Sequence, residues 1–270
     1  MSAPRTIASR RNPLVGRFRR ALSSGPSLLL DGPHLLQEAI AAGLDIEVAV
    51  FETGREDAGL LRRLPPDRVV YAPSAVLGAI SPARTPSGIV ALASRPEPPA
   101  LEELLARPDA LVVGAIDVQD PGNLGAIVRA AEAVGATAVL TTTSGADPFG
   151  WKALRGAMGS AFRLPIARLA SADDIVRAAR GAGLQVAATT GRGGLEPEHV
   201  DFRGPTAVLL GAEGSGLPST IVQAADVRVT IPMARPVESL NVAVTAALLL
   251  YEARRQRRAQ GAGSGIAAAR

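Results

Sequence analysis

Short apolar runs alternate with segments whose apolar residues recur at helical spacing along most of the chain. In the first hundred residues this pattern predicts strands over 27–30, 46–51, 69–71 and 89–93, with helices over 13–22, 33–42, 60–64 and 75–80. The alternation resumes at residue 110, with strands predicted over 110–116, 137–140, 163–166, 185–188 and 206–210. Strands that alternate with helices, several of them apolar on both faces, predict α/β units with a parallel sheet.

The helix predicted from Val242 differs from the others, because residues 242–251 are apolar or small on every face. The run is too short and too rich in Ala and Thr to cross a membrane, so we expect it to be buried in a large core or in a subunit interface. A Pro-punctuated segment, 231–241, leads into this helix and places Ser239 and Asn241 at its start. Ser239 is either a helix cap or part of a site.

The sharpest change of composition is the Pro-rich stretch 95–99, which predicts a domain boundary. We expect a smaller N-terminal α/β domain over 1–96, a linker over 97–100 and a second domain over 101–260. The Arg-rich stretch 254–258 suits the carboxyl end of the last helix. The Gly- and Ala-rich residues 261–270 are expected to form a disordered tail.

Positive charge is concentrated at the N-terminus, where no acidic residue precedes Asp31. The net charge is +4 and the sequence pI about 10.5, which suits a polyanionic partner. The turn-rich loop 81–88 carries one more arginine and is either a recognition loop or an ordinary surface connection. The arginines of the helix predicted over 13–22 either contact phosphates or form a solvated face. The candidate RNA-binding residues are Arg10, Arg11, Arg17, Arg20 and Arg84.

Several classes of site are disfavoured by composition. The chain has no cysteine, which removes disulfides, thiolate zinc sites and cysteine nucleophiles. His34 and His199 are far apart, with no close cluster of His, Asp and Glu expected around them, so we expect no metal; His199 is better explained as a solvated or structural residue than as a general base. No signal peptide or membrane-spanning run is recognisable, which predicts a cytoplasmic protein without a membrane partner.

Two further segments carry polar side chains after buried strands. The strand 110–116 leads into a turn and a helix bearing Asn123 and Arg129; Arg129 lies off the apolar stripe, toward the edge of the sheet where open α/β folds bind ligands. The strand 206–210 leads into a Gly-rich turn around Glu213, whose glycines allow close approach of a ligand. This turn lacks the Lys-Ser/Thr of a phosphate loop and the dinucleotide-binding spacing, and Glu213 suits a cation or an arginine.

Residues 123–131, 210–217 and 231–243 resemble, in this order, the three motifs of the SpoU branch of the SPOUT RNA methyltransferases. Each motif is weak alone, whereas all three in order are specific. The resemblance covers 110–258. The first hundred residues, with the opening Arg11-Asn12-Pro13-Leu14-Val15, resemble the substrate-binding domain of that family, which is similar to kink-turn-binding ribosomal proteins.

The resemblance implies methyl transfer from S-adenosylmethionine to a ribose 2′-hydroxyl of RNA, by a homodimer joined through C-terminal domains with a deep trefoil knot in a parallel sheet. 23S ribosomal RNA is favoured over transfer RNA, because family members with an N-terminal domain of this kind commonly act on ribosomal RNA. The implied catalytic residues are Asn123, Arg129, Glu213, Ser239 and Asn241. The implied cofactor-binding residues are Thr189, Leu210, Gly211, Ala212, Gly214, Ile231, Met233, Leu240 and Val242.

Because a sulfonium methyl is already activated, such an enzyme must align donor and acceptor and help a weakly acidic hydroxyl to lose its proton. A guanidinium stays charged in proteins, so Arg129 is expected to clamp the phosphate beside the target ribose rather than to act as a base. We expect Glu213 to orient Arg129, and Ser239 and Asn241 to hold the ribose or brace the loops. The alternatives are a non-catalytic RNA-binding or ribosome assembly factor on the same fold and, disfavoured by the missing fingerprint, a nucleotide-binding oxidoreductase.

Overall fold

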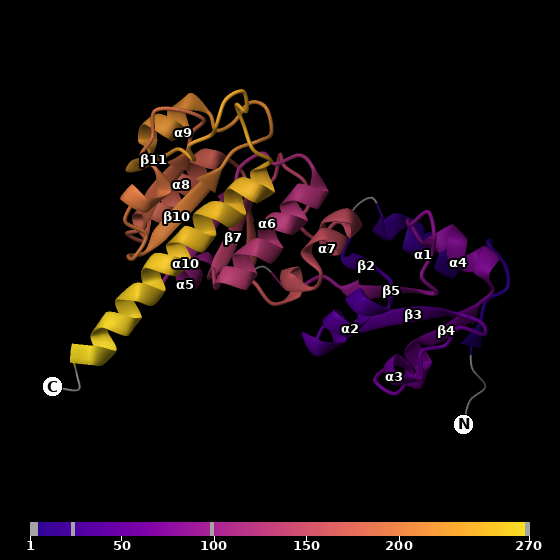
Figure 1. Ribbon diagram of the computed structural model, residues 1–270. Coiled ribbons are helices and arrows are strands. Elements are labelled where there is room, and N and C mark those ends of the chain that lie inside the picture. Colours follow the sequence, from indigo (N-terminus) through magenta and orange to yellow (C-terminus); the bar gives the residue numbers. More distant parts are fainter. Residues whose placement is uncertain (1–4, 23–24, 98–99, 268–270) are drawn as a thin grey trace. The chain divides into compact units, whose positions relative to one another are not determined.

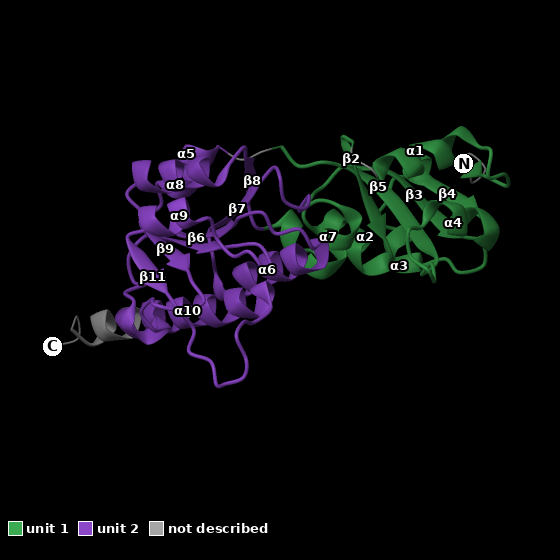
Figure 2. Cartoon of the chain, turned by 90° about the horizontal axis from the view of Figure 1, so that it is seen from above, with its two compact units in different colours: residues 1–97, 149–163 green, residues 98–148, 164–270 purple. Residues whose placement is uncertain are grey.

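The computed structural model describes residues 5–22, 25–97 and 100–267. The chain divides into two compact units (Figures 1 and 2): residues 1–97 with 149–163, and residues 98–148 with 164–270. The N-terminal part of the first unit ends at Glu97, at the start of the predicted linker 97–100. The predicted second domain was too inclusive, however, because the segment 149–163 belongs to the first unit. Parts of the predicted arm, linker and tail, at 1–4, 98–99 and 268–270, lie outside the described residues.

Unit 1 is built on a mixed five-stranded sheet of order β1-β4-β3-β5-β2. β1 and β3 run parallel to β4, whereas β5 is antiparallel to both β3 and β2. The strands are β1 (Arg5–Thr6), β2 (Ser27–Asp31), β3 (Ile46–Glu52), β4 (Val69–Ala72) and β5 (Ile89–Ser94). The helices are α1 (Pro13–Ala21), α2 (Pro33–Ala41), α3 (Ala58–Leu61) and α4 (Ser74–Ile80), with a 3₁₀ turn, η1 (Pro66–Arg68).

The start of α1 shows why these residues form a helix. The Oδ1 atom of Asn12 accepts a hydrogen bond from the backbone N–H of Leu14 at 2.9 Å, and Pro13 occupies the first turn, where its missing N–H costs nothing. Leu14, Val15 and Phe18 then face the core of unit 1 and are buried. The helix predicted over 13–22 is therefore present, and its arginines lie on the solvent side.

The segment 149–163 completes unit 1. It forms α7 (Trp151–Ala157) and a 3₁₀ turn, η2 (Ser160–Phe162), and α7 packs beside β2. Trp151 is partly buried against the core of unit 1, and Arg163 forms an ion pair with Glu38 of α2. The sequence pattern does not indicate the unit against which this helix packs.

Unit 2 contains a six-stranded sheet of order β11-β9-β10-β6-β7-β8, in which every pairing is parallel. The strands are β6 (Leu111–Ala115), β7 (Ala138–Thr142), β8 (Ile166–Leu169), β9 (Gln185–Thr189), β10 (Thr206–Leu210) and β11 (Val227–Val229). α6 (Pro121–Val134) and α10 (Val242–Ala267) lie side by side on one face, and α5 (Leu101–Leu105), α8 (Ala172–Gly181) and α9 (Ser219–Ala224) cover the other (Figure 2). A 3₁₀ turn, η3 (Pro197–His199), lies near α10. No helix in the described ranges is long and apolar enough to span a membrane.

The elements of unit 2 differ from the predicted ones at several places. β8 begins at Ile166 rather than at residue 163, because Pro165 lacks the N–H that a ladder position would donate. α9, a helix of six residues that follows Pro218, was not predicted. α10 continues through residues 261–267, where a disordered tail was expected; no proline follows Arg258 to end the helix.

α10 is buried on one face only. Val242, Ala246, Leu249, Leu250 and Ala253 face the interior of unit 2. On the opposite face of α10, Val244 is 46% exposed, Leu248 is 47% exposed and Tyr251 is 66% exposed. Burial on every face, as predicted from the sequence, is therefore not achieved within a single chain, and an apolar stripe remains on the surface.

Candidate active site

The loops that follow β9, β10 and β11 enclose a cavity of about 570 Å³ with the start of α10. These three strands are neighbours in a parallel sheet, so their carboxyl ends meet at one edge, where open α/β folds bind ligands. The nine residues predicted to bind a cofactor all line this cavity: Thr189, Leu210, Gly211, Ala212, Gly214, Ile231, Met233, Leu240 and Val242. Sequence reasoning missed other lining residues, among them Thr190, Gly191, Glu238 and Thr245, each within three positions of a predicted one, and Leu249, which lies two turns into α10.

The loop after β10 owes its shape to two glycines. A Cβ atom on Gly211 would lie 2.2 Å from the carbonyl carbon of Gly216, which is a clash between backbones that no side-chain movement relieves. Gly216 has a φ of +68°, and its N–H donates to the carbonyl of Ala212 at 2.9 Å. The loop therefore closes on itself and lines the cavity with main-chain groups.

The loops after β9 and β11 are held together by two threonines. The N–H of Thr190 donates to the carbonyl of Val229 at 2.8 Å, and the hydroxyls of Thr190 and Thr230 are 3.0 Å apart. The N–H of Gly194 donates to the Oγ1 atom of Thr230 at 2.9 Å. These bonds fix the side of the cavity that Thr189, Val229 and Ile231 line.

Three of the predicted catalytic residues form one hydrogen-bonded network. The Nδ2 atom of Asn123, on α6, donates to the Oε1 atom of Glu213 at 2.6 Å, and the Nδ2 atom of Asn241 donates to the Oδ1 atom of Asn123 at 3.0 Å. The Oδ1 atom of Asn241 accepts from the N–H groups of Ala243 at 2.9 Å and Val244 at 3.4 Å. Asn241 therefore caps α10 and joins it to α6 and to the loop after β10.

Ser239 is exposed and lines the cavity, but it does not cap α10. Asn241 makes the capping hydrogen bonds instead, which excludes the simple cap as an explanation of Ser239. The hydroxyl of Ser239 thus remains available to a ligand in the cavity.

The expected contact between Glu213 and Arg129 is absent from the chain. Arg129 follows Asn123 by six residues on α6, so the two side chains point about 120° apart around the helix axis. Asn123 faces Glu213, whereas Arg129 is exposed, with no hydrogen bond or ion pair to any of the residues that the structure describes. The partner of Glu213 is Asn123, and the prediction that Glu213 orients Arg129 is wrong within one chain.

The arginines predicted to bind RNA are all exposed on unit 1. These arginines are not equally available to RNA, because some already have partners within the chain. The Nε atom of Arg10 donates to the carbonyl of Ala75 at 3.0 Å, and Arg17 forms an ion pair with Glu47 at 2.7 Å. Arg17 and Arg20 line a surface hollow of about 400 Å³ together with Arg5.

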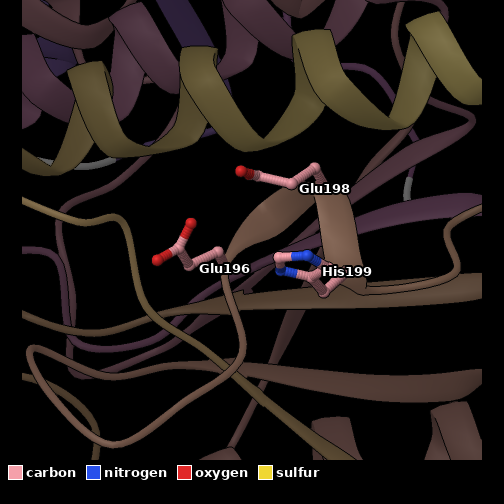
Figure 3. A group of neighbouring side chains, drawn as sticks. All are labelled: Glu196, Glu198 and His199. Atoms are coloured by element: carbon pink, nitrogen blue, oxygen red, sulfur yellow. The ribbon is translucent and has the colours of Figure 1, made fainter.

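The expectation that no close cluster of His, Asp and Glu surrounds His199 was wrong, because neighbouring acids lie in the same turn. Glu196, Glu198 and His199 hold potential ligand atoms within 4.8 Å of one another (Figure 3). All three are exposed, and none of them lines the cavity. Because they come from a single surface turn, and no fourth His, Cys, Asp or Glu joins the group among the residues that the structure describes, we assign no metal to the group.

The cavity suits S-adenosylmethionine in size and chemistry. Its volume falls within the usual range for small-molecule sites. Leu210, Ile231 and Leu249 offer apolar surface to a purine, and the main-chain groups after β10 offer hydrogen bonds. The carboxylate of Glu213 gives the lining a negative charge, which complements a sulfonium better than a phosphate.

The SpoU rRNA Methylase family matches residues 110–251 of the chain. The 23S rRNA (guanosine(2553)-2′-O)-methyltransferase RlmP of Bacillus subtilis is 32% identical over 84% of this chain and 88% of its own. The 23S rRNA (uridine(2479)-2′-O)-methyltransferase of Streptomyces viridochromogenes is 30% identical over 90% and 88% of the two chains. The AdoMet-bound rRNA methyltransferase of Sinorhizobium meliloti is similar in structure, with a TM-score of 0.82, 30% identity and coverage of 93% and 97%. The chain therefore belongs to the SpoU family of S-adenosylmethionine-dependent RNA methyltransferases.

Proposed function

We propose that this enzyme methylates a ribose 2′-hydroxyl in 23S ribosomal RNA, in the cytoplasm. The observation that carries the proposal is the network of Asn123, Glu213 and Asn241 beside the cavity at the carboxyl edge of the sheet. The two relatives named above, whose names specify 23S rRNA 2′-O-methylation, support ribosomal RNA over transfer RNA.

The roles of the residues follow from their contacts. When bound, S-adenosylmethionine supplies an activated methyl group. Glu213 accepts from Asn123 and Asn123 accepts from Asn241, so the orientation of the Asn123 amide is fixed and the loop after β10 is held against α6 and α10. The exposed hydroxyl of Ser239 is placed to hold the ribose. The network thus keeps the cavity wall rigid, as in-line transfer between two bound groups requires.

Arg129 acts as a clamp on the phosphate beside the target ribose. With no ion pair or hydrogen bond to the described part of the chain, its guanidinium has all its N–H donors free for a phosphate. Held there, the cation favours the alkoxide electrostatically and lowers the pKa of the hydroxyl, while the proton leaves to the phosphate or to water.

We further propose that the enzyme acts as a homodimer through the apolar stripe of α10. Val244, Leu248 and Tyr251 are spaced four and three residues apart, which places them on one face of the helix. Exposed apolar surface of this kind is best covered by a second copy. The stripe lies on the helix that packs beside α6, which carries Arg129, so a second copy seated here would approach the clamp.

A charged residue in the stripe tests the dimer. Leu248→Glu puts a carboxylate into the proposed interface and should convert the dimer to a monomer in sedimentation velocity, whereas Thr220→Glu, on the exposed side of α9, should leave it dimeric. A Leu248→Glu protein that stays dimeric would remove α10 from the interface.

The finer points of the fold are also proposals. A deep trefoil knot in unit 2 is supported by β10, which enters the sheet between β9 and β6, and by the bonds that hold residues 190–195 against 228–230. Similarity of unit 1 to kink-turn-binding ribosomal proteins is supported by its mixed sheet flanked by helices and by its exposed arginines.

Two experiments test the proposed function. Calorimetry with S-adenosylmethionine separates an enzyme from a non-catalytic assembly factor, which would not bind the cofactor. Mapping of 2′-O-methyl marks in ribosomal and transfer RNA, from cells with and without the gene, should show one mark in 23S rRNA that depends on the gene. A dependent mark found in transfer RNA alone would overturn the choice of substrate.

A further inference from the structure

A cluster of aromatic rings and cations lies in the segment 149–155 of unit 1. The Nζ atom of Lys152 is 5.6 Å from the centroid of the Trp151 ring, and the Cζ atom of Arg155 is 5.9 Å from the same centroid. The Cζ atom of Arg95 is 5.0 Å from the centroid of Phe149. Two neighbouring rings therefore hold three cations by cation–π contact.

Trp151 makes this cluster rigid. Its side chain is partly buried and packs against the core of unit 1. Lys152 and Arg155 are three residues apart on α7, so they project on the same side of the helix and both reach the ring. Long cationic side chains normally lose conformational freedom when they bind a ligand, and contact with the ring restricts both side chains before any ligand binds.

The cluster is short of negative charge. Residues 149–163 include Lys152, Arg155 and Arg163 and no acidic residue. Arg163 is paired with Glu38, but Lys152 and Arg155 are exposed and have no salt bridge within the described residues. The half-buried Asp31 attracts Arg155, but it already accepts a hydrogen bond from the hydroxyl of Ser81 at 3.0 Å.

We propose that Lys152 and Arg155, held on Trp151, form a phosphate-binding surface through which unit 1 grips the RNA substrate. This inference rests on the proposed function and adds to it a surface that lies in the second half of the chain, outside the N-terminal arginines. Two exposed cations without a carboxylate partner attract a polyanion more strongly than a cation such as Arg17, which Glu47 already neutralises. An acidic protein surface is the competing partner, and the experiment below separates the two.

The chain offers a direct probe, because Trp151 is its only tryptophan. Addition of in-vitro-transcribed 23S rRNA or of an oligouridylate should change the tryptophan fluorescence, since phosphates that draw on the two cations alter the field at the indole ring. Polyglutamate at the same charge concentration should have little effect. An equal response to polyglutamate would overturn RNA as the partner, and no response to either RNA would overturn the surface.

Charge removal tests the same surface by affinity. Lys152→Gln with Arg155→Gln should weaken RNA binding roughly five- to tenfold and lower the slope of log K against log salt by about 1.4, as expected for two lost phosphate contacts on a single strand. The matched control, Arg62→Gln with Arg63→Gln, removes two exposed charges from the same unit and should change the affinity less than twofold. If the two double variants weaken RNA binding equally, the proposed surface is refuted, because the loss then reflects only the lower net charge of the protein.

A third variant tests the ring, and two readouts separate this inference from the proposed function. Trp151→Leu keeps both charges but frees the side chains, and should weaken RNA binding about threefold with an unchanged salt slope. All variants should bind S-adenosylmethionine as the wild type does. If the wild-type protein neither binds nor methylates RNA, the proposed function is refuted. If the wild-type protein does both, and the Lys152→Gln, Arg155→Gln protein binds RNA equally well, only this surface is refuted.

Discussion

Asn241 has two roles that substitutions can separate. Its Oδ1 atom caps α10, and its Nδ2 atom donates to Asn123. Asn241→Ala removes both: loss of the cap costs about 1 kcal/mol and loss of the exposed hydrogen bond about 0.5 kcal/mol, so unfolding should require about 1.5 kcal/mol less. Asn241→Asp keeps an oxygen at the cap, where a negative charge also favours the helix N-terminus, and should change stability by less than about 0.5 kcal/mol.

Catalysis should respond differently from stability. Both substitutions remove the donor to Asn123, and Asn241→Asp also sets a carboxylate against its oxygen. The Asn123 amide then keeps only its hydrogen bond to Glu213, so α10 no longer holds the loop that carries Glu213 and this loop shifts. Because small misplacements of bound groups cost up to about 100-fold in rate, we expect the single-turnover methylation rate to fall about 10- to 100-fold in both variants.

The assay pairs urea unfolding with single-turnover transfer of labelled methyl to 23S rRNA. Ser171→Ala is the matched control, because Ser171 caps α8 of the same unit through its hydroxyl and lies outside the cavity. It should lose about 1 kcal/mol of stability and keep its rate. A wild-type rate for Asn241→Asp, or an equal loss of rate in Ser171→Ala, would refute a positioning role for the network.

Three further predictions follow from single residues. Arg129→Lys should lower the methylation rate at least about tenfold, because an ammonium replaces a forked clamp badly, and near-normal methylation would count against the clamp. Arg257 is partly buried, which lowers its pKa, and its guanidinium donates to the carbonyls of residues 109, 110, 202 and 204. Arg257→Met leaves these carbonyls without a donor and should lower the free energy of unfolding in urea by about 3 kcal/mol. The control, Arg258→Met, should change the free energy of unfolding hardly at all. The side-chain hydrogen bond from Arg203 lowers the pKa of Asp201 to about 2, so this pair stabilises the fold above about pH 4, and its contribution is lost as the pH falls toward 2. Since both groups are exposed, Asp201→Asn should lower the free energy of unfolding at neutral pH by only about 0.5 kcal/mol. An acid-unfolding curve that Asp201→Asn leaves unaltered would contradict this.

Local pattern predicted most of the elements, because each buried strand is a short apolar run and several helices begin after a side-chain cap, such as Asn12, Asp120 or Ser171. The cavity lining was predictable for the same reason: the carboxyl ends of neighbouring parallel strands meet, so the motifs after β9, β10 and β11 had to converge. Contacts between side chains were not predictable in this way. The sequence indicates that Asn123 and Arg129 share a helix, but which of them faces Glu213 depends on the rotation of α6 about its axis.

Two other differences between the predicted and the observed structure also arise because the sequence does not fix contacts between elements. The apolar stripe of α10 indicates that something covers the helix, yet sequence alone does not say whether the cover belongs to the same chain, and here Leu248 remains exposed. Asn241 and Ser239 are both good capping residues, and only the start of the helix at Val242 assigns the cap to Asn241.

The membership of residues 149–163 in unit 1 has a consequence for how the protein is made. A chain emerging from the ribosome exposes β1 to β5 first, but the helix that packs beside β2 arrives only after β6, α6 and β7 have been synthesised. Unit 1 therefore waits for residue 163 before it is complete, and a fragment of residues 1–97 would lack α7 and leave the side of β2 that α7 covers facing water.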